Sequence, residues 1–269
     1  MGVYFRQFKQ LVKLCFFPWP ALNFLSGGAG VEYGVGLFRK LRLMLGALRN
    51  AAHPGSASTF AEQLTLMRGV LAIPASVQGA VAEFGCFKGA STASLSLVCA
   101  ATRRKLLVFD SFEGLPQPLE KVTALESGKE VPYKAGDLTG TLDEVKRTVS
   151  AGGAIRVCEF IQGFFDQTLP TRNSSERFAM IFEDADLPQS VRTVLELCWP
   201  KLGDHCFFYC HEARDKEVID LFYDTVFWRE KLNSKTPGYI GSGCGLPLDP
   251  RGCMLGYAIK FPELALQKS

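Results

Sequence analysis

Most of the chain alternates short apolar runs with amphipathic stretches. Apolar runs that predict strands fall at about 79–84, 105–109, 155–162, 177–183 and 205–210. Stretches with helical periodicity lie between them, near 90–102, 138–150, 188–199 and 215–231. Strands that alternate with helices indicate a parallel sheet with crossover helices, so we expect an α/β fold.

The last part of the chain follows a different pattern. Residues 239–245 and 254–261 flank a turn that contains Pro247, Asp249-Pro250 and Gly252. Two such segments around a proline and glycine turn are typical of an antiparallel hairpin. We therefore expect a C-terminal hairpin at the end of the parallel sheet.

The front of the chain reads as a helical extension. Breaks at 26–30 and 53–58 enclose a stretch with apolar residues at helical spacing, which are Leu37, Leu41, Met44, Leu45 and Leu48. Its expected polar side consists of Arg39, Lys40, Arg42 and Arg49. The segment Thr59-Phe-Ala-Glu62 then has the capping-box pattern that opens a further helix. The predicted division is a helical arm over 1–58 and the main domain over 59–269.

The apolar run at 11–25 predicts neither a membrane span nor a secretory signal. Lys13, Pro18 and Pro20 interrupt it, and no convincing small-residue cleavage site follows. We expect this aromatic arm to pack on the core or to join a homo-oligomer. The alternative is a peripheral membrane contact through its aromatic residues and the nearby Arg6, Lys9 and Lys13.

Composition narrows the function classes. Thirty basic against 27 acidic side chains give a net charge of +3, too small an excess to predict nucleic acid as a partner. The nine cysteines form no CxxC pair, and several lie in apolar runs, so we expect a reduced, cytoplasmic protein. Cys206 and Cys210 come closest to a metal-ligand spacing, but in a strand they would merely share a face.

The end of the first predicted strand carries glycines in a strand-to-helix turn. In Glu83-Phe-Gly85-Cys-Phe-Lys-Gly89, the two glycines allow the backbone to approach a ligand closely. The segment matches neither the phosphate loop nor the GxGxxG fingerprint. Its placement favours a cofactor loop, and the alternative is a tight turn beside a buried Glu83.

The second predicted strand ends in Asp110, where a carboxylate can accept hydrogen bonds from ribose hydroxyls. The segment Phe109-Asp-Ser-Phe-Glu-Gly-Leu-Pro116 resembles the signature of the macrocin O-methyltransferase family. Four more segments resemble that family in the same order, covering roughly 59–212: 81–91, 163–170, 182–187 and 200–202. Residues 1–58 show no such resemblance.

The resemblance implies a seven-stranded, Rossmann-like class I methyltransferase sheet and S-adenosylmethionine as cofactor. It implies contacts from Glu83 to the methionine amino group, from Gly85 and Gly89 to the methionine moiety, and from Asp110 to the ribose. The remaining implied cofactor residues are Ser111, Phe112, Phe165, Asp166 and Asp184. Thr59 is either a contact to the cofactor carboxylate or an ordinary N-cap.

The resemblance also implies methyl transfer to a hydroxyl of a sugar or another small molecule, assisted by a divalent cation. The family's ligand positions fall on Asp184, His211 and Glu212, where paired aspartates are expected in place of the last two residues. An imidazole lowers the negative charge and favours manganese, iron or zinc over magnesium. His211 is alternatively a general base or a polar residue at a strand end.

The neighbouring acids and the acceptor pocket are less defined by the sequence. Asp186 is an alternative acidic ligand, and Glu183 is expected to be a structural partner. The acceptor pocket should come from the segments with the weakest resemblance, 26–58, 113–137 and 232–252. Two other hypotheses stay open here: an enzyme that uses S-adenosylmethionine for another reaction, and a cofactor-binding protein without catalysis.

Overall fold

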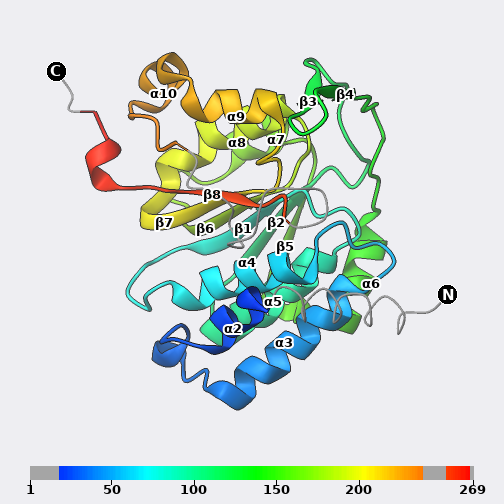
Figure 1. The fold of residues 1–269 in the computed structure, drawn as a ribbon, viewed down its shortest axis with the longest axis vertical. Helices are drawn as coiled ribbons and strands as arrows, with labels where there is room; N and C mark the ends of the chain where they lie inside the picture. The colour runs from blue at the N-terminus through cyan, green and yellow to red at the C-terminus, as the bar shows by residue number, and fades with distance from the viewer. Residues whose placement is uncertain (1–17, 239–252, 267–269) are drawn as a thin grey trace.

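The computed structural model describes residues 18–238 and 253–266 and contains a six-stranded sheet in the order β5-β2-β1-β6-β7-β8 (Figure 1). All neighbouring strands run parallel except β8, which pairs antiparallel with β7. The strands are β1 Ala80–Phe84, β2 Leu106–Asp110, β5 Cys158–Gln162, β6 Phe178–Glu183, β7 Leu202–Cys210 and β8 Gly256–Ile259. A separate hairpin joins β3 Val122–Ala124 to β4 Lys129–Val131. The expected α/β fold with a mostly parallel sheet is confirmed.

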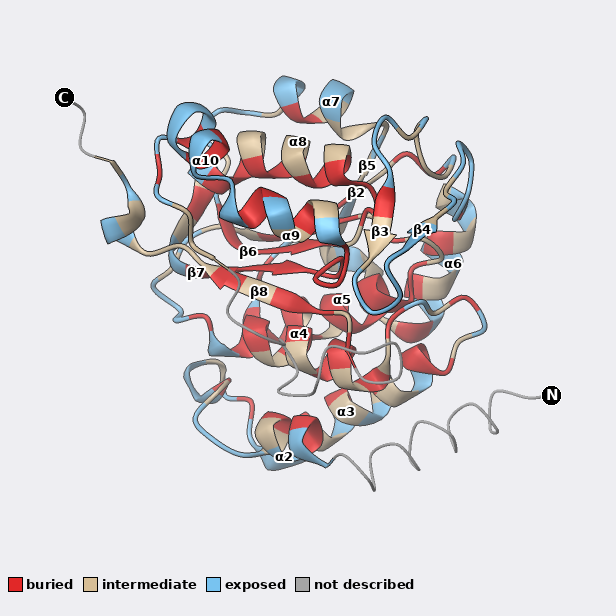
Figure 2. Ribbon diagram, turned by 45° about the horizontal axis from the view of Figure 1, so that its top comes forward, coloured by how far each residue is buried: buried red, intermediate tan, exposed pale blue. Residues whose placement is uncertain are grey.

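Helices cover both faces of this sheet (Figures 1 and 2). One face is covered by α4 Phe60–Ala72, α5 Ala90–Thr102 and α6 Leu142–Gly152, and α3 Leu37–Ala51 packs on the outer side of α4 and α5. The other face packs against α7 Phe165–Thr168, α8 Pro188–Cys198, α9 Lys216–Tyr223 and α10 Thr225–Leu232. Central strands such as β6, buried at every residue, are apolar on both faces because helices exclude water from both.

The strand ends agree closely with the sequence pattern, and the differences have local causes. The predicted helix over 215–231 is two helices, because the Asp224 side chain accepts hydrogen bonds from the amides of Val226 and Phe227 and starts α10. The strand predicted from 155 begins at Cys158, after a 3-10 turn. Of the predicted hairpin, β8 is present, and the segment 239–245 lies outside the described residues.

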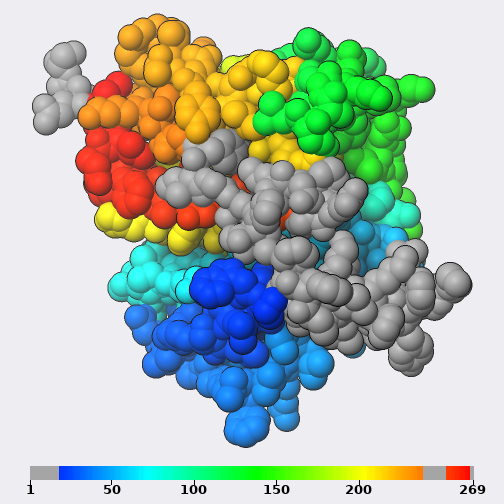
Figure 3. Space-filling model, viewed as in Figure 1, coloured from blue at the N-terminus to red at the C-terminus, as the bar shows by residue number. Residues whose placement is uncertain are grey.

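The N-terminal helices gather at one end of the molecule, opposite α10 and the β3–β4 hairpin (Figure 3). Here the predicted apolar face of α3 is correct only in part. Met44 and Leu48 pack against the core. Leu37 and Leu45 are 56% and 62% exposed, whereas Lys40 is buried. The Lys40 ammonium donates to the carbonyls of residues 25, 26 and 27 at the end of α2 Trp19–Leu25. Buried Asn50 likewise donates to Ser94 and Gly152. Lys40 and Asn50 can face the core because hydrogen-bond acceptors there satisfy their donors.

The predicted capping box at the start of α4 is confirmed. The Thr59 hydroxyl accepts from the amide of Glu62, and the Glu62 carboxylate accepts from the amide of Thr59 at 2.7 Å. A second capping box, from Thr141 and Glu144, opens α6. Within the part of the chain that the structure describes, no helix is both long and apolar enough to cross a membrane.

Candidate active site

A cavity of about 670 Å³ opens at the carboxyl ends of β1, β2 and β6. This is the edge where open α/β sheets collect ligands. Of the residues expected to bind the cofactor, those that line the cavity are Gly85, Asp110, Ser111, Phe165, Asp166 and Asp184. His211 lines it as well, and among the described lining residues it is the only basic side chain.

The glycine loop, residues 83–89 at the end of β1, forms part of the wall of this cavity. Gly85 has φ +82°, and a Cβ there would lie 2.0 Å from the carbonyl oxygen of Asp184. Any side chain at this position would therefore push apart the ends of β1 and β6. Gly89 also has positive φ, at +82°, and caps the start of α5 without lining the cavity.

Asp110 ties the glycine loop to the end of β2. Its Oδ2 accepts from the amide of Cys86 and its Oδ1 from the amide of Phe112, both at 2.7 Å. Burial raises the pKa of Asp110 above its ordinary value, and these amides oppose that rise. Each carboxylate oxygen can accept a second hydrogen bond, so the group is held in place while remaining able to bind a ribose hydroxyl.

Other residues expected to touch the cofactor lie behind the cavity wall. Glu83 is fully buried, neither of its carboxylate oxygens has a hydrogen-bond partner, and burial raises its pKa to about 8. Phe112 is buried with φ +58°. The Thr59 side chain belongs to its capping box, and Ala57 is the residue of that segment that reaches the cavity.

The ends of β6 and β7 bring together the three residues expected to hold a cation. His211 Nδ1 lies 3.0 Å from Asp184 Oδ1, and one potential ligand atom from each of Asp184, His211 and Glu212 lies within 4.8 Å of the others. On its other side, His211 Nε2 faces Glu62 Oε1 at 3.5 Å. Burial alone would lower the pKa of His211, but the carboxylates of Asp184 and Glu62 raise it well above its ordinary value.

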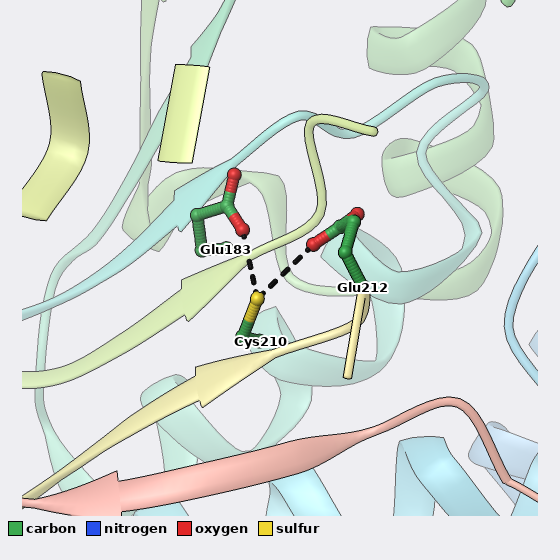
Figure 4. A group of neighbouring side chains, drawn as sticks. All are labelled: Glu183, Cys210 and Glu212. Carbon is green, nitrogen blue, oxygen red and sulfur yellow. Dashed lines mark hydrogen bonds between the residues drawn. The ribbon is translucent and has the colours of Figure 1, made fainter. Parts of the chain in front are cut away.

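Behind this group, a thiol lies between two carboxylates (Figure 4). Cys210 Sγ is 3.2 Å from Glu183 Oε2 and 3.2 Å from Glu212 Oε2. The other oxygen of Glu212 accepts from the amide of Asp186. Burial and mutual repulsion raise the pKa of Glu212, so this buried pair favours a shared proton over two full charges. The expectation that Glu183 has a structural role fits this position.

Acidic groups outnumber basic ones around His211. Burial and the charge of Asp184 raise the pKa of Asp186 to about 7, and the Tyr133 hydroxyl donates to Asp186 at 2.9 Å. An imidazole nitrogen from His211 and carboxylate oxygens from Asp184 and Glu212 are donor types that divalent cations bind. The donor set therefore fits a divalent cation.

Two contributors to this site were not expected from the sequence. Glu62 showed only its capping pattern, and its approach to His211 depends on the packing of α4 against the sheet. Burial alone would raise the pKa of Glu62, but His211 and the amides of Thr59 and Met254 lower it to about 2. Tyr133 lies in the segment 113–137 that was expected to form part of the acceptor pocket, and no local pattern links it to Asp186.

Comparison with known proteins agrees with this architecture. The profile of the family described as macrocin-O-methyltransferase matches residues 63–222. An 8-demethyl-8-(2,3-dimethoxy-alpha-L-rhamnosyl)-tetracenomycin-C 4'-O-methyltransferase from Streptomyces olivaceus is 31% identical over 179 residues, which cover 59% of this chain and 68% of that protein.

Two solved structures share the fold. The O-methyltransferase NovP superposes with a TM-score of 0.59 at 19% identity, over 78% of this chain and 84% of NovP. The calicheamicin methyltransferase CalS11 gives 0.52 at 16% identity, over 82% and 92% of the two chains. The extent of the family match and the related sequence settle the assignment: the chain belongs to the macrocin O-methyltransferase family of S-adenosylmethionine-dependent O-methyltransferases.

Proposed function

We propose that this enzyme methylates a hydroxyl of a sugar or sugar-bearing natural product, with a divalent cation at Asp184, His211 and Glu212. The observation that carries the proposal is the convergence of these three residues, with Asp184 and His211 lining the cavity. The related tetracenomycin enzyme, by its name, methylates a rhamnosyl group. That name supports a sugar hydroxyl as the acceptor.

The cavity lining supports a neutral acceptor. Apolar side chains on its outer part include Leu115, Pro116, Leu119 and Leu138, and polar groups that can bind hydroxyls include Gln189 and Thr193. Among the described residues, no lysine or arginine lines the cavity. A sugar or aromatic ring that carries hydroxyl groups suits such a surface better than a highly anionic acceptor does.

The chain contributes position and charge to the reaction. Asp110, Ser111 and the glycine loop would hold the cofactor, so that its sulfonium methyl faces the ends of β6 and β7. A bound cation would lower the cost of deprotonating the acceptor hydroxyl. Asp184, His211 and Glu212 would hold that cation, and Asp186, fixed by Tyr133, would face the acceptor from the same edge.

Chelation tests the cation. Exhaustive chelation should abolish turnover, and manganese or iron should restore it better than magnesium because an imidazole favours the later transition metals. His211→Asp should move the preference toward magnesium, whereas His205→Ala, at an exposed position of β7, should change nothing. Turnover that survives chelation but is lost in His211→Ala would assign His211 as the base instead.

Product analysis tests the reaction. Methyl transfer yields S-adenosylhomocysteine and a product heavier by one methylene. Consumption of S-adenosylmethionine without such a product would favour altered chemistry, and binding without consumption would favour a non-catalytic protein.

The division at residue 58, the cytoplasmic location and a homo-oligomer through the N-terminal arm stay predictions. Exposed apolar residues within that arm support the proposal of an oligomer, and they include Trp19, Leu22, Leu37, Phe38 and Leu45. Light scattering should show a mass above that of one chain, reduced when residues 1–30 are deleted. Co-sedimentation of a monomer with liposomes would favour the membrane contact instead.

A further inference from the structure

Glu62 lies directly behind His211. It comes from the first turn of α4, is 1% exposed and does not line the cavity. The imidazole is enclosed between two carboxylates, with Nδ1 3.0 Å from Asp184 Oδ1 and Nε2 3.5 Å from Glu62 Oε1. His211 therefore has an acidic neighbour for each ring nitrogen, and only Asp184 is on the cavity side.

Other contacts fix the Glu62 carboxylate in place. Its Oε2 accepts from the amide of Thr59 at 2.7 Å and from the Thr59 hydroxyl at 2.9 Å. Its Oε1 accepts from the amide of Met254 at 2.7 Å, and Met254 lines the cavity. Three donors from two distant segments thus hold the carboxylate, and Oε1 keeps a lone pair for His211.

The ring nitrogen that faces Glu62 has no other partner. His211 Nε2 is buried and makes no hydrogen bond, and a buried polar group left in this state costs about 1–3 kcal/mol. The 3.5 Å gap to Glu62 Oε1 is a few tenths of an ångström longer than an ordinary hydrogen bond. Contacts at a reaction centre are often long in the empty site and shorten when ligands bind.

Helix capping does not explain why Glu62 is buried there. The same chain has a second capping box, Thr141 and Glu144, with the same reciprocal hydrogen bonds. Glu144 caps α6 at a half-buried position, whereas Glu62 is 1% exposed and faces an imidazole nitrogen. A buried carboxylate costs free energy unless it is paired, so the position of Glu62 requires a further reason.

We propose that Glu62 is a positioning residue for methyl transfer. Its carboxylate accepts a hydrogen bond from the Nε2–H group of His211 and so directs Nδ1 toward Asp184 and the cavity. A carboxylate that accepts from the far nitrogen of a histidine fixes both ring orientation and tautomer. The proposal rests on the function proposed above, and it applies to His211 as a cation ligand and as a base.

The first experiment compares Glu62→Gln with the matched control Glu144→Gln. Titration calorimetry with Mn²⁺ should show about 10- to 100-fold weaker binding for Glu62→Gln and no change for Glu144→Gln. The thermal midpoints of both variants show what each cap contributes to stability. Equal Mn²⁺ affinity of Glu62→Gln and the wild type, when the wild type binds Mn²⁺, would overturn the proposal. If Glu62→Gln does not fold, Glu62→Asp keeps the charge but retracts it, and the same loss of affinity is expected.

The second experiment is a double-mutant cycle with His211→Asn. Because Glu62 acts through His211, Glu62→Gln should lower kcat in the wild type, leave the KM for S-adenosylmethionine unchanged, and cost nothing further in His211→Asn. Additive losses would overturn the role. If the wild-type protein binds no Mn²⁺, the cation proposal fails, and the cycle still decides the role of Glu62.

Discussion

The two ends of the cavity stabilise their acidic groups differently. At the β1 and β2 end, backbone amides of Cys86 and Phe112 hold Asp110 in place before any ligand binds. At the β6 and β7 end, several carboxylates surround one imidazole. Burial, together with repulsion from neighbouring carboxylates, raises the pKa values of Asp186 and Glu212. The first end is organised by the backbone, whereas the second carries an excess of negative charge that a cation would relieve.

The largest effect should come from Asp184→Asn, at the second end. Removing this charge should lower turnover at least about 100-fold, because holding a Lewis acid is worth several kcal/mol. Turnover measured with and without added Mn²⁺ checks it, and the residual rate should no longer respond to the metal. Turnover within tenfold of the wild type would remove the functional distinction between the two ends.

Asp110→Ala tests the first end. It should weaken the binding of S-adenosylhomocysteine by about 1.5–3 kcal/mol, or about 10- to 150-fold, through loss of hydrogen bonds to a charged acceptor. Calorimetry measures it. Unchanged affinity would show that Asp110 only fastens the glycine loop.

Tyr133→Phe sharpens the comparison at the acceptor side. Loss of the hydroxyl that donates to Asp186 should lower kcat/KM for the acceptor by about 1 kcal/mol, roughly fivefold. Steady-state kinetics with each substrate varied in turn would show this, and the affinity for S-adenosylhomocysteine should stay constant. A change confined to cofactor binding would place Tyr133 in the other half of the cavity.

Glu83 is the exception at the β1 and β2 end, because no backbone amide stabilises its carboxylate. Its substitution should have the smallest effect of the four, a pH-dependent change in stability. An acid whose pKa is about 8 in the folded protein and about 4.5 when unfolded takes up a proton on folding. The free energy of unfolding therefore falls as the pH rises from about 4.5 to about 8. Glu83→Gln should remove that loss and raise the thermal midpoint at pH 8 by about 2–4 °C per kcal/mol recovered. At pH 4.5 the two midpoints should agree, and the same offset at both pH values would contradict the assignment.

The sequence predicted what depends on local pattern. The strand ends at Asp110 and Glu183 follow from apolar runs, and the Thr59 capping box follows from its spacing. The buried face of α3 was predicted only in part, because Lys40 is buried where its ammonium donates hydrogen bonds to carbonyl groups at the end of α2. Periodicity assigns lysine to the outside, and only the packed structure shows where its charge is satisfied.

The sequence predicted only those residues of the candidate site whose positions follow from strand order. Asp184, His211 and Glu212 follow neighbouring parallel strands, so their convergence could be inferred from topology. Glu62 could not be found in this way, because it lies on a helix whose contact with His211 depends on tertiary packing.

The hydrogen bond from the Met254 amide to Glu62 has a consequence for synthesis of the chain. The glycine loop, β6 and His211 are synthesised well before Met254. A partly made chain therefore contains the residues expected to bind the cofactor but lacks the Met254 amide that holds Glu62. The hydrogen bonds that hold Glu62 are therefore complete only after Met254 has been synthesised. A truncation that removes β8 and the residues just before it should therefore abolish turnover.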